Sequence, residues 1–390
     1  MKKQNILFIV YTFVILIIGS LTLVREQKET SQLENRGLNK FEHLTINSYL
    51  NGSFQSNLES AMEDQFVGGE TIKIVFNGIL KLFKYSKIPQ RICENRYVKI
   101  SNTYANYNCG DYLLYNFYHP TANTIEKLED VIDNYNTINK HIDTYYYFIP
   151  TSQILDFEND KTSIDVIKIL QENLEDQKEF DFLKINSYDE YEKLFYKTDH
   201  HWNHVGAHTA YKDIMNMFNK KCKPLEPIEE LVFKDIIFYG SMARYSQILD
   251  YKEKFTVYRY DMPDMNVISN RNSEGYGTEE EYYKGNYFNE KFSNHYGLYY
   301  GEDYAEVSIE ANSGKRNLLI IGNSYSNSVN KLIATHFNKT YDVDLRHYES
   351  TFNENFNIKK YVKENNIHKV LFIMDYSFLT DKYFNIRWEE

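Results

Sequence analysis

The sequence predicts an α/β protein in which a mostly parallel sheet is flanked by helices, with an N-terminal transmembrane helix in front of it. Short apolar runs at Tyr145–Ile149, Leu318–Ile321 and Val370–Met374 have the length and bounding residues of buried strands. Stretches with apolar residues at helical spacing lie between them. Alternating strands and helices favour a parallel sheet, in which reactive groups gather beyond the C-terminal ends of the strands.

The first thirty residues precede this fold. Lys2 and Lys3 are followed by an uncharged run, and its apolar centre, residues 6–24, would form a helix about 28 Å long at roughly 1.5 Å per residue. That length nearly matches a hydrocarbon core of about 30 Å. No small-x-small cleavage site follows. We therefore expect residues 1–28 to be an uncleaved anchor, with a cleaved signal peptide as the alternative. Both place the rest of the chain outside the cytoplasm.

The rest of the chain shows no repeat, no low-complexity tract and no Pro-rich or Gly/Ser-rich linker. We expect an entry segment at 29–110, packed on one main domain at 111–390. The net charge is −11, and no cluster of Lys and Arg interleaves with aromatic residues, which argues against nucleic acid as a partner.

The apolar spacing predicts helices in several segments, and Asn203 is a good N-cap for a helix that runs to about Phe218. Residues 245–315 are rich in Tyr, Asn and Gly, and we interpret them as strands and loops inserted before the Leu318–Ile321 strand. Val343–Tyr348 and Val370–Met374 are expected to be the last core strands. The other predicted helices span 52–62, 70–85, 124–140, 162–178 and about 358–366.

Two distant segments predict one catalytic site. In the first, Thr198–Asn203, Asp199 and His201 have the spacing of an orienting carboxylate and a base. In the second, Gly322–Ser326, Ser324 lies at a strand–turn–helix junction that exposes its hydroxyl near free backbone N–H groups. Serine is a poor nucleophile without an oriented base, so Ser324, His201 and Asp199 together predict an acyl-transfer triad.

The Asp-His-His-Trp-Asn and Gly-Asn-Ser-Tyr-Ser motifs together resemble the DHHW family, which is related to the AlgX/AlgJ alginate O-acetyltransferases with their SGNH hydrolase-like domain. Entry residues Glu34–Arg36 and Asp64–Phe66 extend the resemblance. AlgX-like proteins also place Asp-x-His before the serine. This chain departs from SGNH enzymes by having Asn323 where Gly-Asp-Ser is common, and it lacks a clear Gly-x-Asn-Asp segment.

The resemblance implies a membrane-anchored, extracytoplasmic acyltransferase or esterase of the SGNH type that adds or removes acetyl groups on a cell-surface or exported polysaccharide. It implies no cofactor. The acyl donor would be a membrane-bound O-acyltransferase. A non-catalytic glycan-binding or polysaccharide assembly protein with the same fold is the alternative.

Other residues are candidates for contacts with the oxyanion or the substrate. The backbone N–H of Tyr325 directly follows the nucleophile, and Trp202 would border the acyl pocket or simply pack beside the site. The segment Phe238–Arg244 replaces the missing oxyanion segment, with Gly240 allowing close backbone approach. Ser241 and Arg244 would contact the substrate.

The histidines also raise the question of a metal site. His200, His204 and His208 have i, i+4, i+8 spacing, which a helix would place on one face. No glutamate lies between the paired histidines, and the helix is expected to begin only near Asn203. We therefore expect no catalytic metal, with a metal-dependent hydrolase as a further alternative.

Two composition features leave their questions open. Cys93 and Cys109 would pair across a short loop in an oxidising compartment, whereas free thiols are the alternative. The 36 tyrosines would suit a polysaccharide cleft, but a biased genome is the stronger explanation.

Overall fold

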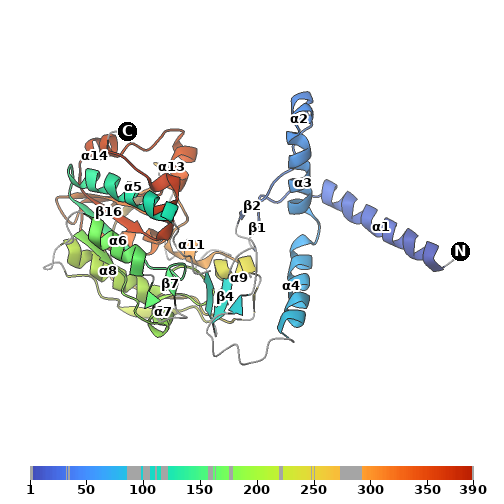
Figure 1. Ribbon diagram of the computed structural model, residues 1–390, viewed down its shortest axis with the longest axis horizontal. Helices are drawn as coiled ribbons and strands as arrows, with labels where there is room; N and C mark the ends of the chain where they lie inside the picture. Colours follow the sequence, from blue (N-terminus) through green and yellow to red (C-terminus); the bar gives the residue numbers. More distant parts are fainter. Residues whose placement is uncertain are drawn as a thin grey trace. The chain divides into compact units, whose positions relative to one another are not determined.

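A computed structural model gives the fold of the chain (Figure 1). The chain forms two compact units, Met1–Ile92 and Cys93–Glu390. The structure describes residues 3–31, 33, 36–85, 98–99, 106–109, 112–115, 122–156, 161–162, 164–174, 179–218, 223–246, 248–249, 251–272 and 292–388. The predicted motif residues Glu34 and Asn35, and the predicted Cys93–Cys109 pair, lie outside the described residues and side chains.

The first unit is helical. Gln65 is fully buried and ties the unit together, because its side chain accepts a hydrogen bond from the Lys28 N–H and donates to the carbonyls of Lys28 and Asn39. Within the described residues, no helix combines the length and apolar character that crossing a bilayer requires. The predicted helices at 52–62 and 70–85 are confirmed. The elements are α1 (Lys3–Val24), β1 (Thr30–Ser31), β2 (Arg36–Gly37), α2 (Ile46–Leu50), α3 (Ser53–Gln65) and α4 (Gly69–Tyr85).

The second unit is built on a seven-stranded sheet, which confirms the predicted α/β class with a mostly parallel sheet flanked by helices. The strand order is β12-β13-β15-β14-β16-β6-β9. The strands from β15 to β9 are parallel, whereas β12 and β13 add an antiparallel edge. The strands are β6 (Thr144–Phe148), β9 (Phe180–Phe182), β12 (Asn266–Ser269), β13 (Glu306–Glu310), β14 (Asn317–Ile321), β15 (Lys339–Val343) and β16 (Ile367–Met374).

Helices cover both faces of the sheet (Figure 1). Leu319 and Ile321 of β14 point into the cluster formed with α5, α6, α13, α14 and α15. Leu318 and Ile320 alternate to the other face, where α7, α8 and α12 pack. The helices are α5 (Ala122–Asn139), α6 (Ile164–Asn173), α7 (Tyr188–Leu194), α8 (His204–Phe218), α12 (Asn330–Ala334), α13 (Leu345–Phe352), α14 (Ile358–Glu364) and α15 (Tyr376–Thr380).

Smaller elements complete the unit. Among the described residues, a three-stranded sheet has the order β3-β4-β5, and two smaller sheets pair β7 with β8 and β10 with β11. These strands are β3 (Val98–Lys99), β4 (Asn106–Cys109), β5 (Tyr112–Tyr115), β7 (Leu155–Asp156), β8 (Lys161–Thr162), β10 (Glu229–Val232) and β11 (Thr256–Arg259), and the short helices are α9 (Ser241–Ser246), α11 (His295–Tyr300), η4 (Ser326–Ser328) and η5 (Lys382–Phe384).

Two predicted segments need correction. Val343–Tyr348 is not a strand, because β15 ends at Val343 and Asp344 caps α13 by accepting a hydrogen bond from the Arg346 N–H. Residues 245–315 are not strands and loops alone. They contain α11, which Asn294 caps through its side chain, and its six residues are too few to show helical periodicity. The predicted N-cap at Asn203 is confirmed, since its side chain accepts from the N–H groups of Val205 and Gly206.

Candidate active site

Ser324 lies on the tight turn that follows β14. The turn begins at Gly322, whose N–H donates to the Val343 carbonyl on the neighbouring strand. A Cβ at Gly322 would come within 2.6 Å of the Ser326 side chain, so this close approach requires glycine. The chain then continues into η4 and α12. This arrangement places the Ser324 hydroxyl at the carboxyl edge of the sheet.

The buried carboxylate of Asp342 stabilises this turn through hydrogen bonds. Asp342 on β15 accepts hydrogen bonds from the Ser326 hydroxyl at 2.8 Å and from the Asn330 amide at 2.9 Å. Burial raises the pKa of Asp342 to about 7, although both of these bonds favour its charged form. The sequence motifs did not indicate Asp342, because it lies on a different strand from the turn that it supports.

The base and its orienting carboxylate lie on the loop before α8. The loop is fixed by backbone hydrogen bonds from Tyr196 N–H to the His201 carbonyl and from Asn203 N–H to the Leu194 carbonyl. Gly206 on α8 lies so close to Leu194 that a Cβ there would meet the Leu194 carbonyl oxygen at 2.2 Å. The loop is therefore held tightly against the start of the helix.

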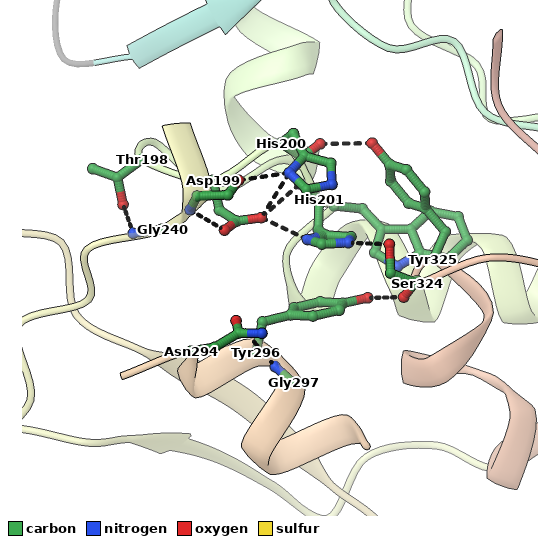
Figure 2. A network of polar contacts seen from close by, with 12 residues as sticks. Thr198, Asp199, His200, His201, Gly240, Asn294, Tyr296, Gly297, Ser324 and Tyr325 are labelled. Atoms are coloured by element: carbon green, nitrogen blue, oxygen red, sulfur yellow. Dashed lines mark hydrogen bonds and ion pairs between the residues drawn. The ribbon is translucent and has the colours of Figure 1, made fainter. Parts of the chain in front are cut away.

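The two segments meet in a continuous hydrogen-bonded chain (Figure 2). His201 Nδ1 lies 2.6 Å from Asp199 Oδ1, and His201 Nε2 lies 2.7 Å from Ser324 Oγ. Asp199 is 1% exposed and His201 is 6% exposed, whereas Ser324 is partly accessible. Because an ionised Asp199 can only accept, Nδ1 carries the proton, and neutral His201 presents Nε2 as an acceptor to the serine hydroxyl.

Electrostatics keep Asp199 ionised. Burial by itself would raise its pKa, but the interactions of Asp199 with His201, with the nearby His200 and with the Ser241 N–H hold the pKa of Asp199 well below its usual range. The Ser241 N–H donates to Asp199 Oδ2 at 2.6 Å, and the His201 N–H donates to Oδ1 at 3.0 Å. The carboxylate therefore has a donor at each oxygen.

Tyr296 on α11 is a site residue that the sequence motifs did not indicate. Its ring stacks on the His201 imidazole, with 3.9 Å between ring centroids and 7° between ring planes. Its hydroxyl donates to the Ser324 carbonyl at 3.0 Å (Figure 2). A single side chain therefore contacts both the base and the backbone of the nucleophile. The Asn294 cap is a local feature that indicates the start of α11, but it carries no information about the role of Tyr296.

Gly240 and Ser241 lie behind Asp199. A Cβ at Gly240 would meet the Asp199 Cβ at 2.4 Å and the Thr198 carbonyl at 2.5 Å. The close backbone approach predicted at Gly240 is therefore made to the loop that carries Asp199. Glu253 supports the same loop by accepting hydrogen bonds from the N–H groups of Lys197 and Thr198 and from the Thr198 hydroxyl. Burial raises the pKa of Glu253 to about 7.

Several backbone N–H groups that were candidates for the oxyanion are already engaged. The Tyr325 N–H donates to Asn323 Oδ1 at 3.1 Å, and the Gly240 N–H donates to the Thr198 hydroxyl at 3.1 Å. The Ser241 N–H donates to Asp199. By contrast, the Ser324 N–H donates to no acceptor in the described part of the chain.

Trp202 and Arg244 are both buried near the triad. Trp202 is fully buried, and its indole N–H donates to the Ser328 hydroxyl at 2.6 Å beneath the nucleophile turn. Arg244 is 1% exposed, and its Nη1 donates to the Phe292 carbonyl at 3.3 Å. Burial lowers the pKa of Arg244, and the charge of Asp199 opposes that effect. Both side chains support the site from within the fold.

The predicted histidine cluster is split. His200 Nδ1 lies 2.6 Å from the Ser241 hydroxyl, and burial together with His201 lowers the pKa of His200 to about 3. His204 and His208 lie on α8 beside Glu230 and Glu226. Potential metal-ligand atoms of Asp199, His200 and His201 do lie within 4.8 Å of one another. A cation there would compete with Asp199 and Ser324 for the two nitrogens of His201.

A scan of protein-family models and a search of curated proteins found no match to this chain. Among solved structures, Bacillus cereus PatB1 with a sulfonyl adduct matches at 21% identity and a TM-score of 0.56, covering 74% of this chain and 100% of PatB1. A DHHW family protein from Eubacterium siraeum matches at 18% identity and a TM-score of 0.54, covering 74% and 97%. This chain has the fold of those two proteins.

The expected resemblance to the DHHW family is therefore confirmed at the level of fold. Pseudomonas aeruginosa AlgX also matches, at 12% identity and a TM-score of 0.37 over 74% of this chain and 65% of AlgX. The O-acetyltransferase domain of Pseudomonas putida AlgJ matches at 10% identity and a TM-score of 0.37 over 70% and 91%.

Proposed function

We propose that this chain is a serine-dependent O-acyltransferase or carbohydrate esterase. The observation that carries the proposal is the unbroken chain of short contacts from Asp199 through His201 to Ser324. This geometry supplies a nucleophile, a base and a group that orients the base, which are the three roles required for acyl transfer through serine.

In the first half of the cycle, Ser324 Oγ attacks the acyl carbonyl carbon while His201 Nε2 takes the hydroxyl proton. Asp199 stabilises the imidazolium that forms. Collapse of the tetrahedral intermediate breaks the bond to the donor's alcohol oxygen, which takes the proton back from His201. The product of this half is an acyl ester on Ser324.

In the second half, an acceptor hydroxyl attacks that ester and gives its proton to His201. The bond to Ser324 Oγ then breaks, and Oγ takes the proton, which restores the resting enzyme. A sugar hydroxyl as acceptor gives an O-acylated polysaccharide, whereas water gives hydrolysis. Acetyl is the acyl group that the family resemblance favours.

We assign the Ser324 N–H as one oxyanion donor, because it has no acceptor among the described residues and lies on the nucleophile itself. The Tyr325 N–H can serve as a second donor only when the Asn323 side chain releases it. Asn323 is in turn held by Asp375, to which its amide donates at 3.2 Å.

We also propose that residues 6–24 anchor the chain in the cell membrane, with the triad on the extracytoplasmic side. The uncharged run from Gln4 to Val24 supports this. A membrane-bound O-acyltransferase would then deliver the acyl group. Retention of the chain in membranes washed with alkaline carbonate tests the anchor, and release into the wash would refute it.

The triad is tested by treating the full chain with an activated acetyl ester or a serine-reactive phosphonate and locating the adduct by mass spectrometry. We expect an adduct on Ser324 that is lost in Ser324→Ala and His201→Ala. Ser350→Ala, which removes an exposed hydroxyl on α13, should leave it unchanged. A folded wild-type chain without an adduct would instead support the non-catalytic glycan-binding alternative. Activity abolished by a chelator would support the metal-dependent alternative.

A further inference from the structure

A polar pocket of about 450 Å³ lies over β12, β13 and β15, apart from the triad. This volume is within the range of roughly 300–1,000 Å³ that is typical of small-molecule sites. Its wall residues Tyr341 and Tyr361 belong to the core cluster on one face of the sheet, whereas Trp202 and Tyr325 beside the triad belong to the cluster on the other face. The pocket is therefore a separate feature of the fold.

The floor of the pocket is the polar face of β13. Along this strand, Val307 and Ile309 point into an apolar cluster, so Glu306 and Ser308 point to the opposite face. Glu306 is 6% exposed and Ser308 is 9% exposed, although both line the pocket. Recessed polar groups cost free energy unless they are hydrogen-bonded. Hydrogen bonds from Tyr361 and Arg271 stabilise Glu306 at this position, and Ser308 lines the pocket beside it.

Glu306 provides an acceptor with spare capacity. Its Oε2 accepts from the Tyr361 hydroxyl at 2.9 Å and lies 3.4 Å from the Arg271 guanidinium. Its Oε1 receives no hydrogen bond from the described residues. A carboxylate oxygen can accept two hydrogen bonds, so Oε1 can accept from hydroxyl groups of a ligand.

Arg271 lines the pocket from a tight turn. Asn270 has φ 47° and Arg271 has φ 57°, within a tight turn closed by the bond from Asn272 N–H to the Ser269 carbonyl. Positive φ at both central residues is the usual geometry of a type I′ hairpin turn, and here the turn fixes the position of Arg271. The guanidinium is fixed by Glu354 at 2.8 Å and lies 4.0 Å from the centre of the Phe352 ring.

The lining indicates the chemical class of the ligand. Its ionisable side chains are three basic and three acidic, so their formal charge is zero and an anion gains no net attraction. Three tyrosines and three asparagines supply hydroxyls, amides and ring edges. The basic residues are Arg271, Lys339 and Lys360, the acidic residues are Glu306, Glu354 and Glu364, the tyrosines are Tyr341, Tyr348 and Tyr361, and the asparagines are Asn355, Asn357 and Asn365.

We propose that this pocket binds a neutral sugar unit of a glycan, with Glu306 Oε1 accepting from its hydroxyls. Carboxylates, amides and aromatic rings together match a polyhydroxylated ring, which offers both O–H donors and apolar C–H faces. The glycan is held independently of the triad, on another face of the sheet. The assignment of this glycan as the acyl acceptor rests on the proposed function, whereas the binding itself does not.

The test uses the full chain in a non-glycosidic detergent with a panel of neutral trisaccharides built from glucose, N-acetylglucosamine, mannose or galactose. Binding is measured by calorimetry and by saturation-transfer NMR. We expect at least one trisaccharide to bind and inorganic phosphate not to bind. Glu306→Gln should weaken binding about tenfold or more, because a hydrogen bond to a charged acceptor is lost.

Two further variants make the result decisive. Ile268→Trp fills the pocket from half-buried β12 and should abolish binding, whereas Val232→Trp, at an exposed position on β10, should not. Ser324→Ala should bind as the wild type does, so failure of the proposed catalysis would not be mistaken for failure of the pocket. No trisaccharide binding at millimolar concentration, or equal binding by the two tryptophan variants, would overturn the proposal.

Discussion

Replacing Asp199 with asparagine is the most direct test of the hydrogen-bonded chain, because the substitution preserves shape and removes charge. Three N–H groups point at the two carboxylate oxygens of Asp199, namely His201 Nδ1–H, the His201 backbone and the Ser241 backbone. An amide offers only one oxygen to these donors. In one orientation the amide NH₂ faces Ser241, and in the other it faces both donors of His201.

Each orientation has a distinct cost. With the NH₂ toward Ser241, a buried N–H loses its acceptor, which lowers the free energy of unfolding by about 1–3 kcal/mol. With the NH₂ toward His201, the ring changes tautomer, so that Nε2 carries the proton and donates to Ser324. His201 then cannot accept the serine proton. This second outcome should lower kcat by about three to four orders of magnitude, as the equivalent change does in serine proteases.

The assay is hydrolysis of an activated acetyl ester by the full chain, with kcat and KM determined separately and unfolding followed by circular dichroism. We expect a lower kcat with little change in KM, because the ground state does not use the lost proton transfer. Glu349→Gln, an exposed change of the same type on α13, is the matched control. A folded Asp199→Asn chain that keeps kcat within tenfold of the wild type and also loses less than about 1 kcal/mol in the free energy of unfolding would match neither orientation, and it would refute the assignment of Asp199 and His201.

Three other substitutions test neighbouring features. Tyr296→Leu removes the ring stacked on His201 and should lower kcat about 10–100-fold, whereas Tyr296→Phe keeps the ring and should lose less than tenfold in the same ester assay. Glu253 has a folded pKa of about 7 against an ordinary 4.5, so the folded state binds the proton more tightly and stability should fall as pH rises through that window. Denaturant titrations of Glu253→Gln should show this fall reduced by about 1–3 kcal/mol, and an unchanged slope would contradict the shift. Asp342→Ala leaves the Asn330 amide without this acceptor, whereas the Ser326 hydroxyl can still donate to the Asn323 carbonyl. The substitution should lower the free energy of unfolding by about 1–3 kcal/mol, and an unchanged free energy of unfolding would argue against the supporting role of Asp342.

The sequence predicted the parts of the fold in which local pattern and burial agree. The apolar run Val370–Met374 lies within β16, and the helix predicted at 124–140 is α5. Asn203 caps α8 as its side-chain chemistry favours. The prediction was wrong at Val343–Tyr348, where the apolar residues continue past a capping Asp344 and the strand pattern conceals the start of a helix.

The candidate site shows the same division between local and distant features. Asp199 and His201 are two residues apart, and Ser324 lies at a recognisable strand–turn junction, so their meeting was predictable. Tyr296 and Asp342 were not, because each reaches the site from a separate element and neither has a motif around it. The engagement of the Tyr325 N–H by Asn323 is also a property of the folded turn that residue types alone do not reveal.

The two buried aspartates of the site have opposite pKa shifts, and this difference separates their roles. Asp199 faces histidine rings and backbone N–H groups, which hold its pKa well below the usual range. Burial and the nearby carboxylates of Asp344 and Asp303 instead raise the pKa of Asp342 to about 7, against the effect of its neutral hydrogen-bond donors. Asp199 therefore remains ionised between pH 5 and pH 8. A fall in activity between pH 8 and pH 5 must then reflect another group. Of the two aspartates, only Asp342 changes charge there, and it does so beneath the turn that carries Ser324.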